Sequence, residues 1–174
     1  MSVPPSPSLA RLARLLRELD LDVGALAARA AECGDLLALG DQRPLSRPEL
    51  VLLAVNLHGW YTGLETLLER VASLYDREVP SGSTWHADLL AQMGTTVPGW
   101  RPALVPEAVL GDLHELRRFR HFFRNAYVLE LDPTRVRAQA ERLRRVAPEV
   151  SAGIASFRGH LDEVISRLAG DTGG

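Results

Sequence analysis

Apolar residues recur every three or four positions along most of the chain, a spacing typical of amphipathic helices. The first such stretch covers residues 9–40, with an interruption expected at Asp20–Gly24, where charged residues and a glycine break the pattern. The second covers 47–75. Ser46 and Glu49 have the spacing of a capping box, which marks the start of that helix.

The second half of the chain predicts shorter elements first and a long helical section last. The elements expected are a loop over 76–83, a short helix over 85–93, an ordered surface loop over 94–106, a helix over 107–129 and a helical section over 134–169. Asp132 and Pro133 separate the last two helices as a cap and a first-turn proline. Pro148 and Gly153 predict a break or bend within the final section.

Strand-type alternation over four or more residues is absent from the sequence, so the pattern predicts an all-α fold. Four to five main helices with a short crossover helix favour an up-and-down bundle. We expect a single helical domain over 9–169, between a disordered proline- and serine-rich tail at 1–8 and a frayed tail at 170–174.

Cysteine usage and hydropathy bear on the compartment. Cys33 is the only cysteine, so no internal disulfide is possible and a reducing compartment is the natural setting. The N-terminal residues lack the charged start and apolar run of a secretion signal, and no stretch approaches about 18 uninterrupted apolar residues. We therefore expect a soluble, cytoplasmic protein without a membrane partner.

Positive charge is concentrated in one segment. Residues 117–145 contain nine arginines against three acidic residues, a balance of +6, whereas the whole chain has a formal charge of −2. This asymmetry predicts an anionic partner for one face of the molecule. All 20 basic residues are arginine, for which coding bias is the favoured reason, although arginine forks also suit phosphate groups.

The densest part of this segment is residues 116–127, LRRFRHFFRNAY, which contain no acidic side chain. At roughly 100° per residue, a helix here predicts one buried apolar face. That face consists of Leu116, Phe119, Phe122, Phe123 and Ala126. Six of the other residues form two adjacent polar stripes, Arg117, His121 and Asn125 in one and Arg120, Arg124 and Tyr127 in the other.

Polar residues outside this stretch give weaker indications of a functional site. His86 falls in a first helical turn, where capping or packing is the favoured interpretation over catalysis. His58, Tyr61 and Glu65 lie at helical spacing but lack a second histidine or a cysteine, so we interpret them as a polar edge and expect no metal site. Glycine-rich phosphate loops, nucleophile elbows, HExxH and CxxC motifs are missing from the sequence.

The arginine-rich stretch resembles a known motif. HepT-type toxins, which belong to the HEPN superfamily of helical ribonucleases, have a signature motif. In it, four residues separate an arginine from a histidine, and one residue separates that histidine from a tyrosine. Here Arg120, Asn125 and Tyr127 hold the three positions, so asparagine replaces the histidine. The blocks FRHFFRNAYVLELDP, YTGLE, WHADLLAQM and RPALVPE are similar to those of a HepT-like branch, and the resemblance covers roughly residues 50–135.

The resemblance implies a HEPN-like bundle and a metal-independent, cofactor-free endoribonuclease that acts on RNA as a homodimer. In such enzymes the arginine holds the scissile phosphate while the ribose 2′-OH attacks it, which leaves a cyclic phosphate and a free 5′-OH. Arg120 would take this role, assisted by Arg124, with Arg117 and Arg118 as further phosphate ligands.

The replaced histidine changes the assignment of proton transfer, because asparagine cannot exchange a proton at physiological pH. Our hypothesis is that His121 takes the acid/base role and that Asn125 orients the phosphate or the ribose. The alternative is that His121 only borders the dimer contact and that catalysis has been lost.

The resemblance also implies a partner and a modification. HepT toxins are silenced by a minimal nucleotidyltransferase antitoxin, which attaches AMP to a tyrosine of the motif. By position, Tyr127 would be the acceptor, or else a half-buried anchor of the helix end. Three functions stay open at this point: a toxin-like ribonuclease, a catalytically degenerate module that binds RNA, a nucleotide or a protein, and a helical dimer whose arginines pair with acidic groups of the partner subunit.

Overall fold

The computed structural model describes residues 7–125 and 131–171 of the 174-residue chain, and over these ranges the fold is an all-α bundle, as predicted. The helices are α1 (Pro7–Gln42), α2 (Arg47–Val71), α3 (Trp85–Gly94), α4 (Leu110–Asn125) and α5 (Pro133–Asp171), with a π-helical turn at Ala72–Asp76 and a 3-10 turn at Glu107–Val109. Within the described ranges, strand-type pairing is limited to one isolated bridge between Val97 and Arg101.

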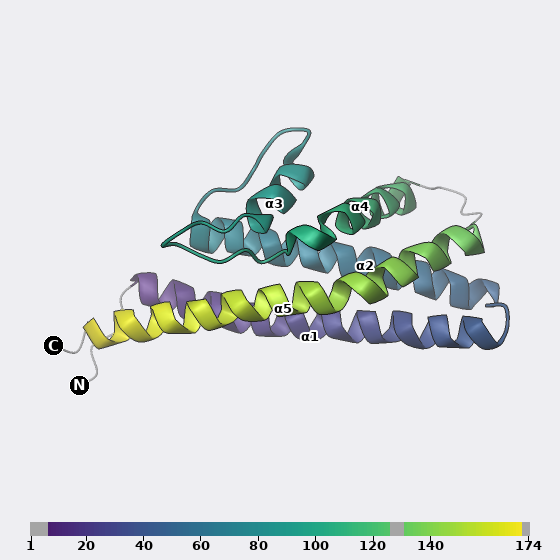
Figure 1. Ribbon diagram of the computed structural model, residues 1–174, viewed down its shortest axis with the longest axis horizontal. Coiled ribbons are helices and arrows are strands. Elements are labelled where there is room, and N and C mark those ends of the chain that lie inside the picture. Colours follow the sequence, from purple (N-terminus) through teal and green to yellow (C-terminus); the bar gives the residue numbers. More distant parts are fainter. Residues whose placement is uncertain (1–6, 126–130, 172–174) are drawn as a thin grey trace.

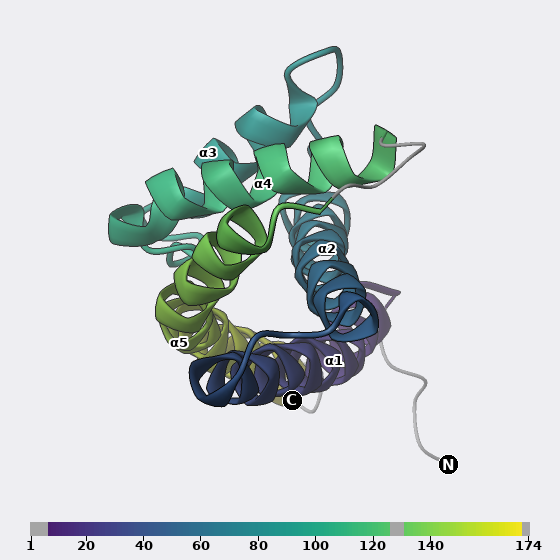
Figure 2. The same ribbon diagram turned by 90° about the vertical axis from the view of Figure 1, so that its right-hand side faces the viewer.

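Three long helices form the body of the molecule. Figure 1 shows α1, α2 and α5 lying side by side along the long axis, with α1 antiparallel to both of its neighbours. Viewed from the end, α3 and α4 lie on one side of this body, where α4 crosses over α2 and α5 (Figure 2). Helix α4 is therefore an outer element with one face against the bundle.

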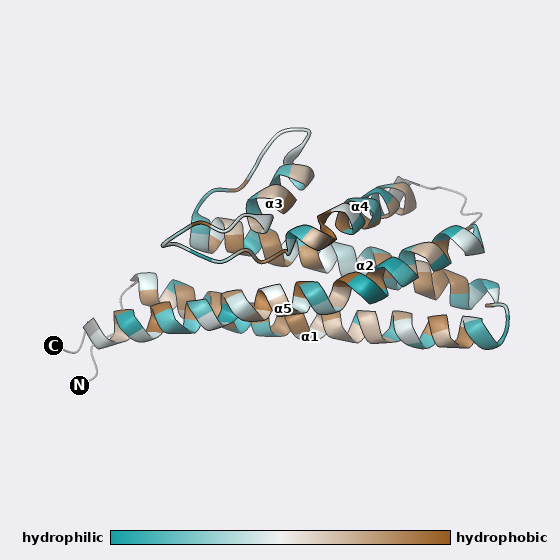
Figure 3. Ribbon diagram, in the orientation of Figure 1, coloured by the Kyte–Doolittle hydropathy of each residue, from teal (hydrophilic) through white to brown (hydrophobic). Residues whose placement is uncertain are grey.

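One continuous core joins all five helices. Hydrophobic and hydrophilic residues alternate around the long helices in Figure 3, as the periodicity predicted. Residues that are almost completely inaccessible to solvent come from every helix, for example Leu15, Trp60, Leu89, Leu113 and Phe157. Burial of this apolar surface is the main term that stabilises the bundle.

The interruption predicted at Asp20–Gly24 is wrong, because α1 runs through it without a break. Leu19 and Leu26 on either side are both buried, so the core-facing stripe continues. The two acidic residues lie at the flanks, where Asp20 accepts a hydrogen bond from Arg158 (2.7 Å) and Asp22 one from Arg70 (3.1 Å). Contacts to α5 and α2 thus stabilise a segment that is a weak helix former on its own.

Of the break or bend predicted within the last section, the break is wrong, since α5 continues through Pro148 as one helix. Val146, Val150 and Ile154 are all buried on the same side, so the core contacts continue past the proline. Gly153 marks a close approach instead of a break. A Cβ atom built there would lie 2.2 Å from the carbonyl oxygen of Leu104, because the loop before α4 passes directly over the helix.

Other sequence predictions are confirmed. Ser46 and Glu49 form the capping box at the start of α2, and α3 occupies nearly the expected range.

Cys33 is buried, and burial raises the pKa of its thiol to about 12, which keeps the thiol protonated and unreactive. Among the described residues, no helix has an apolar stretch long enough to span a membrane.

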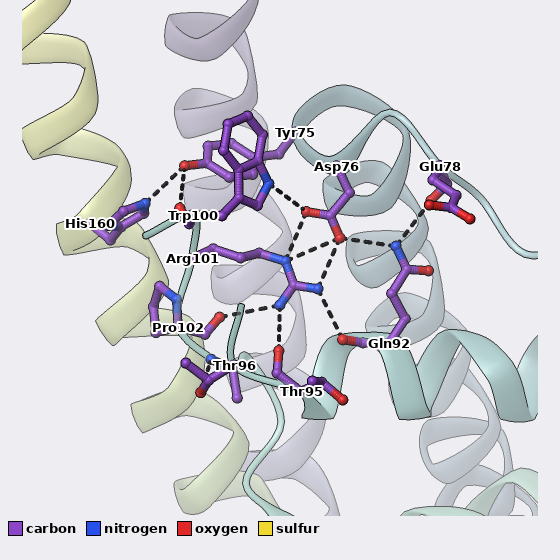
Figure 4. Close-up of polar contacts among 11 residues, drawn as sticks. Tyr75, Asp76, Glu78, Gln92, Thr95, Thr96, Trp100, Arg101, Pro102 and His160 are labelled. Atoms are coloured by element: carbon purple, nitrogen blue, oxygen red, sulfur yellow. Dashed lines mark hydrogen bonds and ion pairs between the residues drawn. The ribbon is translucent and has the colours of Figure 1, made fainter. Parts of the chain in front are cut away.

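A buried arginine anchors the loop between α3 and α4 (Figure 4). Arg101, whose side chain is 1% exposed, donates from Nε and Nη2 to the carboxylate of Asp76 at 2.8–3.1 Å. It also donates to the backbone carbonyls of Thr95 and Gln92, each at 2.9 Å. The side chains of Trp100 and Gln92 donate to the same carboxylate. This cluster, which we call the Arg101 clasp, joins the loop to the end of α2.

Candidate functional site

Helix α4 contacts the bundle through a narrow stripe. Leu113, Leu116 and Phe119 are buried, whereas Phe122 is 52% exposed, so the prediction that Phe122 packs in the core is wrong. At roughly 100° per residue, Phe122 lies about 120° around the helix from the centre of this stripe. Arg120, in contrast, lies at its edge, between the directions of Leu113 and Leu116. Ala126 is outside the described residues.

The position of Arg120 brings it against α2. Its Nε donates a hydrogen bond to Oγ1 of Thr62 (3.2 Å), and its Nη2 lies 2.9 Å from Oε2 of Glu65. The side chains of Arg120 and Glu65 are only 13% and 7% exposed. The 116–127 stretch contains no acid of its own, but α2 supplies one, so the guanidinium is held in a fixed position by a buried carboxylate.

The same carboxylate holds a histidine of α3. Nδ1 of His86 donates a hydrogen bond to Oε1 of Glu65, while Oε2 of Glu65 pairs with Arg120. The imidazole also lies against the indole of Trp85, with ring centroids 3.7 Å apart and the ring planes tilted by 30°. Glu65 therefore links three helices. The interpretation of His58, Tyr61 and Glu65 as a polar edge is wrong for Tyr61 and Glu65, since both are buried.

Helices α3 and α4 enclose an open depression of about 700 Å³, which we call the α3–α4 groove. It is lined by Gly82, Ser83, Trp85, His86, Arg117, Arg118, Arg120, His121 and Phe122. Four of the predicted site residues thus share one cavity, namely Arg117, Arg118, Arg120 and His121. Arg124 and Asn125 belong to α4, but their side chains lie outside what the structure describes, as does Tyr127 as a whole.

The groove has an excess of positive charge. Glu65 compensates one guanidinium, and Arg118 forms an exposed ion pair with Glu115. Nε of Arg117 is buried, and no hydrogen-bond partner for it exists among the described residues. Burial, together with the nearby positive charges of Arg117 and Arg118, lowers the pKa of His114 on the same helix. An anion is the ligand that this field favours.

Sequence analysis missed His86 and Glu65 as members of the site. Neither belongs to the arginine-rich helix, and each lies in a helix of its own, so spacing along the chain could not join them. The available signal was the resemblance of the YTGLE and WHADLLAQM blocks, which contain these two residues. Within the described ranges, no group of three or more histidine, cysteine, aspartate or glutamate residues is placed to hold a metal ion.

Comparison with known proteins identifies the family of the chain. Residues 52–161 match the model of a family described as HepT-like protein, and the match includes α3, α4, the Glu65 region of α2 and most of α5. No curated protein and no solved structure matches the chain. The matched region is more than half of the sequence and contains every described residue of the α3–α4 groove, and on this basis the chain belongs to the HepT-like family.

Proposed function

We propose that the protein is a toxin-like, metal-independent endoribonuclease that cleaves RNA by attack of a ribose 2′-OH on the adjacent phosphate. The observation that carries this proposal is the α3–α4 groove, in which Arg117 and Arg120 lie together with the imidazoles of His86 and His121. Cleavage of this type needs fixed positive charge on the phosphoryl oxygens and groups that exchange protons near neutral pH.

Arg120 suits the phosphate-binding role because its geometry is already fixed. Its guanidinium is held by Thr62 and Glu65, so little side-chain entropy is lost when a ligand binds. Arg117 and Arg118 lie one helical turn or less away along the same cavity. They supply the remaining positive charge, because Glu65 offsets part of that of Arg120.

The direct test is cleavage of a single-stranded RNA by the purified protein in the presence of EDTA. We expect products that end in a 2′,3′-cyclic phosphate and begin with a 5′-OH, identified by mass spectrometry. A substrate with one 2′-deoxyribose should resist cleavage at that position, because the attacking hydroxyl is absent. Activity that depends on added metal, or 5′-phosphate products, would contradict the proposal.

The second candidate function is a non-catalytic module that binds RNA or another polyanion. The ion pair between Arg120 and Glu65 and the asparagine at position 125 both favour it, since they weaken the catalytic motif. The same assay separates the two functions. A binding module would retain the RNA in a gel-shift experiment and leave every phosphodiester bond intact, however long the incubation.

We also propose that the protein acts as a homodimer. Val51, Leu52 and Val55 form an apolar patch on the outside of α2, each 38–48% exposed, and Phe122 adds exposed apolar surface on α4. A symmetric dimer would cover such a patch with its own copy. Light scattering should give a mass near twice the 19.1 kDa of the chain, and a monomer after Leu52→Asp combined with Val55→Asp.

The proposed antitoxin is a minimal nucleotidyltransferase that attaches AMP to Tyr127. The support is family membership and the tyrosine at the motif position, in a segment outside the described residues. After co-expression with such an enzyme, mass spectrometry should find an AMP adduct on the peptide that contains Tyr127, and none in a Tyr127→Phe variant.

A further inference from the structure

His86 contributes an imidazole to the α3–α4 groove from outside the arginine-rich helix. Its side chain is 25% exposed, while that of Glu65, its partner, is 7% exposed. The ring is restrained by two contacts, the hydrogen bond from Nδ1 to Glu65 and the tilted ring contact with Trp85. This double restraint is more than a helix cap requires, and it leaves the imidazole beside Arg120.

The hydrogen bond determines which ring nitrogen can react. A carboxylate can only accept, so Nδ1 of His86 has the proton in this contact. In the neutral ring, Nε2 then has the free lone pair and is the basic nitrogen. A buried acid that orients an imidazole in this way is the arrangement that general bases use in many hydrolytic sites.

Cleavage by a 2′-OH needs two proton transfers, one away from the nucleophile and one toward the leaving oxygen. Position 125 cannot supply either, since it is asparagine. Two imidazoles line the groove, His86 from α3 and His121 from α4. The chain therefore contains both groups that the reaction requires, on two different helices that line one cavity.

We propose that His86 is the general base of this site, oriented by Glu65, and that His121 is the general acid; this inference rests on the proposed ribonuclease function. The 2′-OH proton moves to Nε2 of His86 as O2′ forms a bond to phosphorus. The P–O5′ bond breaks, and the leaving O5′ takes a proton from His121. The products are a 2′,3′-cyclic phosphate and a 5′-OH, and water returns the two histidines to their starting protonation states.

The shared carboxylate gives this arrangement a further property. Glu65 fixes both the group proposed to hold the phosphate and the group proposed to accept the proton, so the two are placed relative to each other by one residue. Glu65 itself does not line the groove and is a positioning residue. Tyr61 is buried beside Glu65. The pKa of its phenol is raised, mainly because the side chain is buried and also because Glu65 is negatively charged.

The test compares His86→Gln and His86→Ala with the wild-type protein. Glutamine can still donate a hydrogen bond to Glu65 but cannot exchange a proton, so the fold is kept while the base is lost. We expect kcat to fall by about 10²–10⁴-fold in both variants, with KM changed by only a few-fold. Added imidazole should restore part of the activity of His86→Ala. Binding of a non-cleavable 2′-O-methyl RNA should stay unchanged.

The pH profile gives a second measurement. A base is active when deprotonated, so its loss removes the acidic limb of the rate profile, whereas loss of the acid removes the alkaline limb. We expect the first in His86→Gln and the second in His121→Ala. On the neighbouring helices, Glu65 of α2 contacts the His86 ring, Tyr61 lies near Glu65, and the charged or titratable residues of α4 that line the same groove are Arg117, Arg118, Arg120 and His121.

The control is His160→Ala, which removes a partly exposed histidine of α5 that pairs with Tyr75 and does not line the groove. Its cleavage rate should match that of the wild type. If the wild type cleaves RNA and His86→Gln cleaves at the same rate with both limbs of the profile intact, the role of His86 is refuted and the ribonuclease stands. If the wild type does not cleave at all, both proposals fall together.

Discussion

Replacing Arg120 with alanine is expected to lower the rate of RNA cleavage by about 10²-fold or more, the effect of removing one fixed donor from a developing negative charge. The Arg120 side chain is only 13% exposed and its Nη2 lies 2.9 Å from Oε2 of Glu65, so the substitution removes a positive charge that is held in a fixed position. Single-turnover rates with excess enzyme would measure the chemical step directly. Arg120→Lys should recover only part of the rate, because a point charge replaces the planar fork.

Two further variants separate catalysis from folding. Arg120→Ala leaves Glu65 buried without its cation, which lowers stability by itself. Combining Arg120→Ala with Glu65→Gln removes both charges, so this double variant should melt closer to the wild type and still fail to cleave. Arg144→Ala deletes an exposed arginine of α5 and changes the net charge equally. It should cleave normally, and an equal loss in this control would mean that net charge alone explains the result.

Replacing Arg101 with alanine is expected to lower the free energy of unfolding by about 3–5 kcal/mol, the cost of removing one partner from a buried ion pair. Asp76 would lose its main cation, the carbonyl of Thr95 would lose the donor from Arg101, and the carbonyl of Gln92 would keep only the backbone N–H of Thr95. Urea unfolding followed by circular dichroism would measure the change. The matched control is Arg14→Ala, whose ion pair with Glu18 is exposed and whose loss should cost no more than about 1 kcal/mol.

The Arg101 clasp also predicts a dependence on pH. Burial alone would raise the pKa of Asp76, but hydrogen bonds from Arg101 and Gln92 outweigh it and lower the pKa below its ordinary value. The pair therefore contributes its full stability above about pH 4 and loses it as the pH falls through the lowered pKa. In Arg101→Ala this part of the acid sensitivity should disappear. A wild-type acid transition unchanged by the substitution would contradict the assignment.

Sequence periodicity was enough to predict the helices because, within each helix, buried residues recur every three or four positions. Ser46 and Glu49 predicted a helix start correctly for the same reason, since a cap depends on residues three positions apart. The helix breaks predicted at Pro148 and at the Asp20–Gly24 segment are wrong. Both are locally unfavourable for a helix, and both are overridden by contacts with other helices that no local pattern contains.

In the candidate site, too, the sequence predicted the residues that are close along the chain and missed those that only folding brings together. Arg117, Arg120 and His121 share one helix, so spacing alone predicted the two adjacent polar stripes that contain them. Glu65 and His86 enter from α2 and α3, at sequence distances that only the folded chain makes short. The prediction that Phe122 is buried was wrong for a different reason. The width of the buried stripe on α4 depends on how the helix crosses the bundle.

The close approach at Gly153 fixes more than a single contact. Only a hydrogen atom fits beneath the carbonyl of Leu104, and the residues before and after the glycine are Ala152 and Ile154. Sliding α5 by one residue in either direction would drive a side chain into that carbonyl. The glycine thus sets the register of the longest helix in the molecule, and shear of α5 along the bundle is blocked unless the loop before α4 lifts away first.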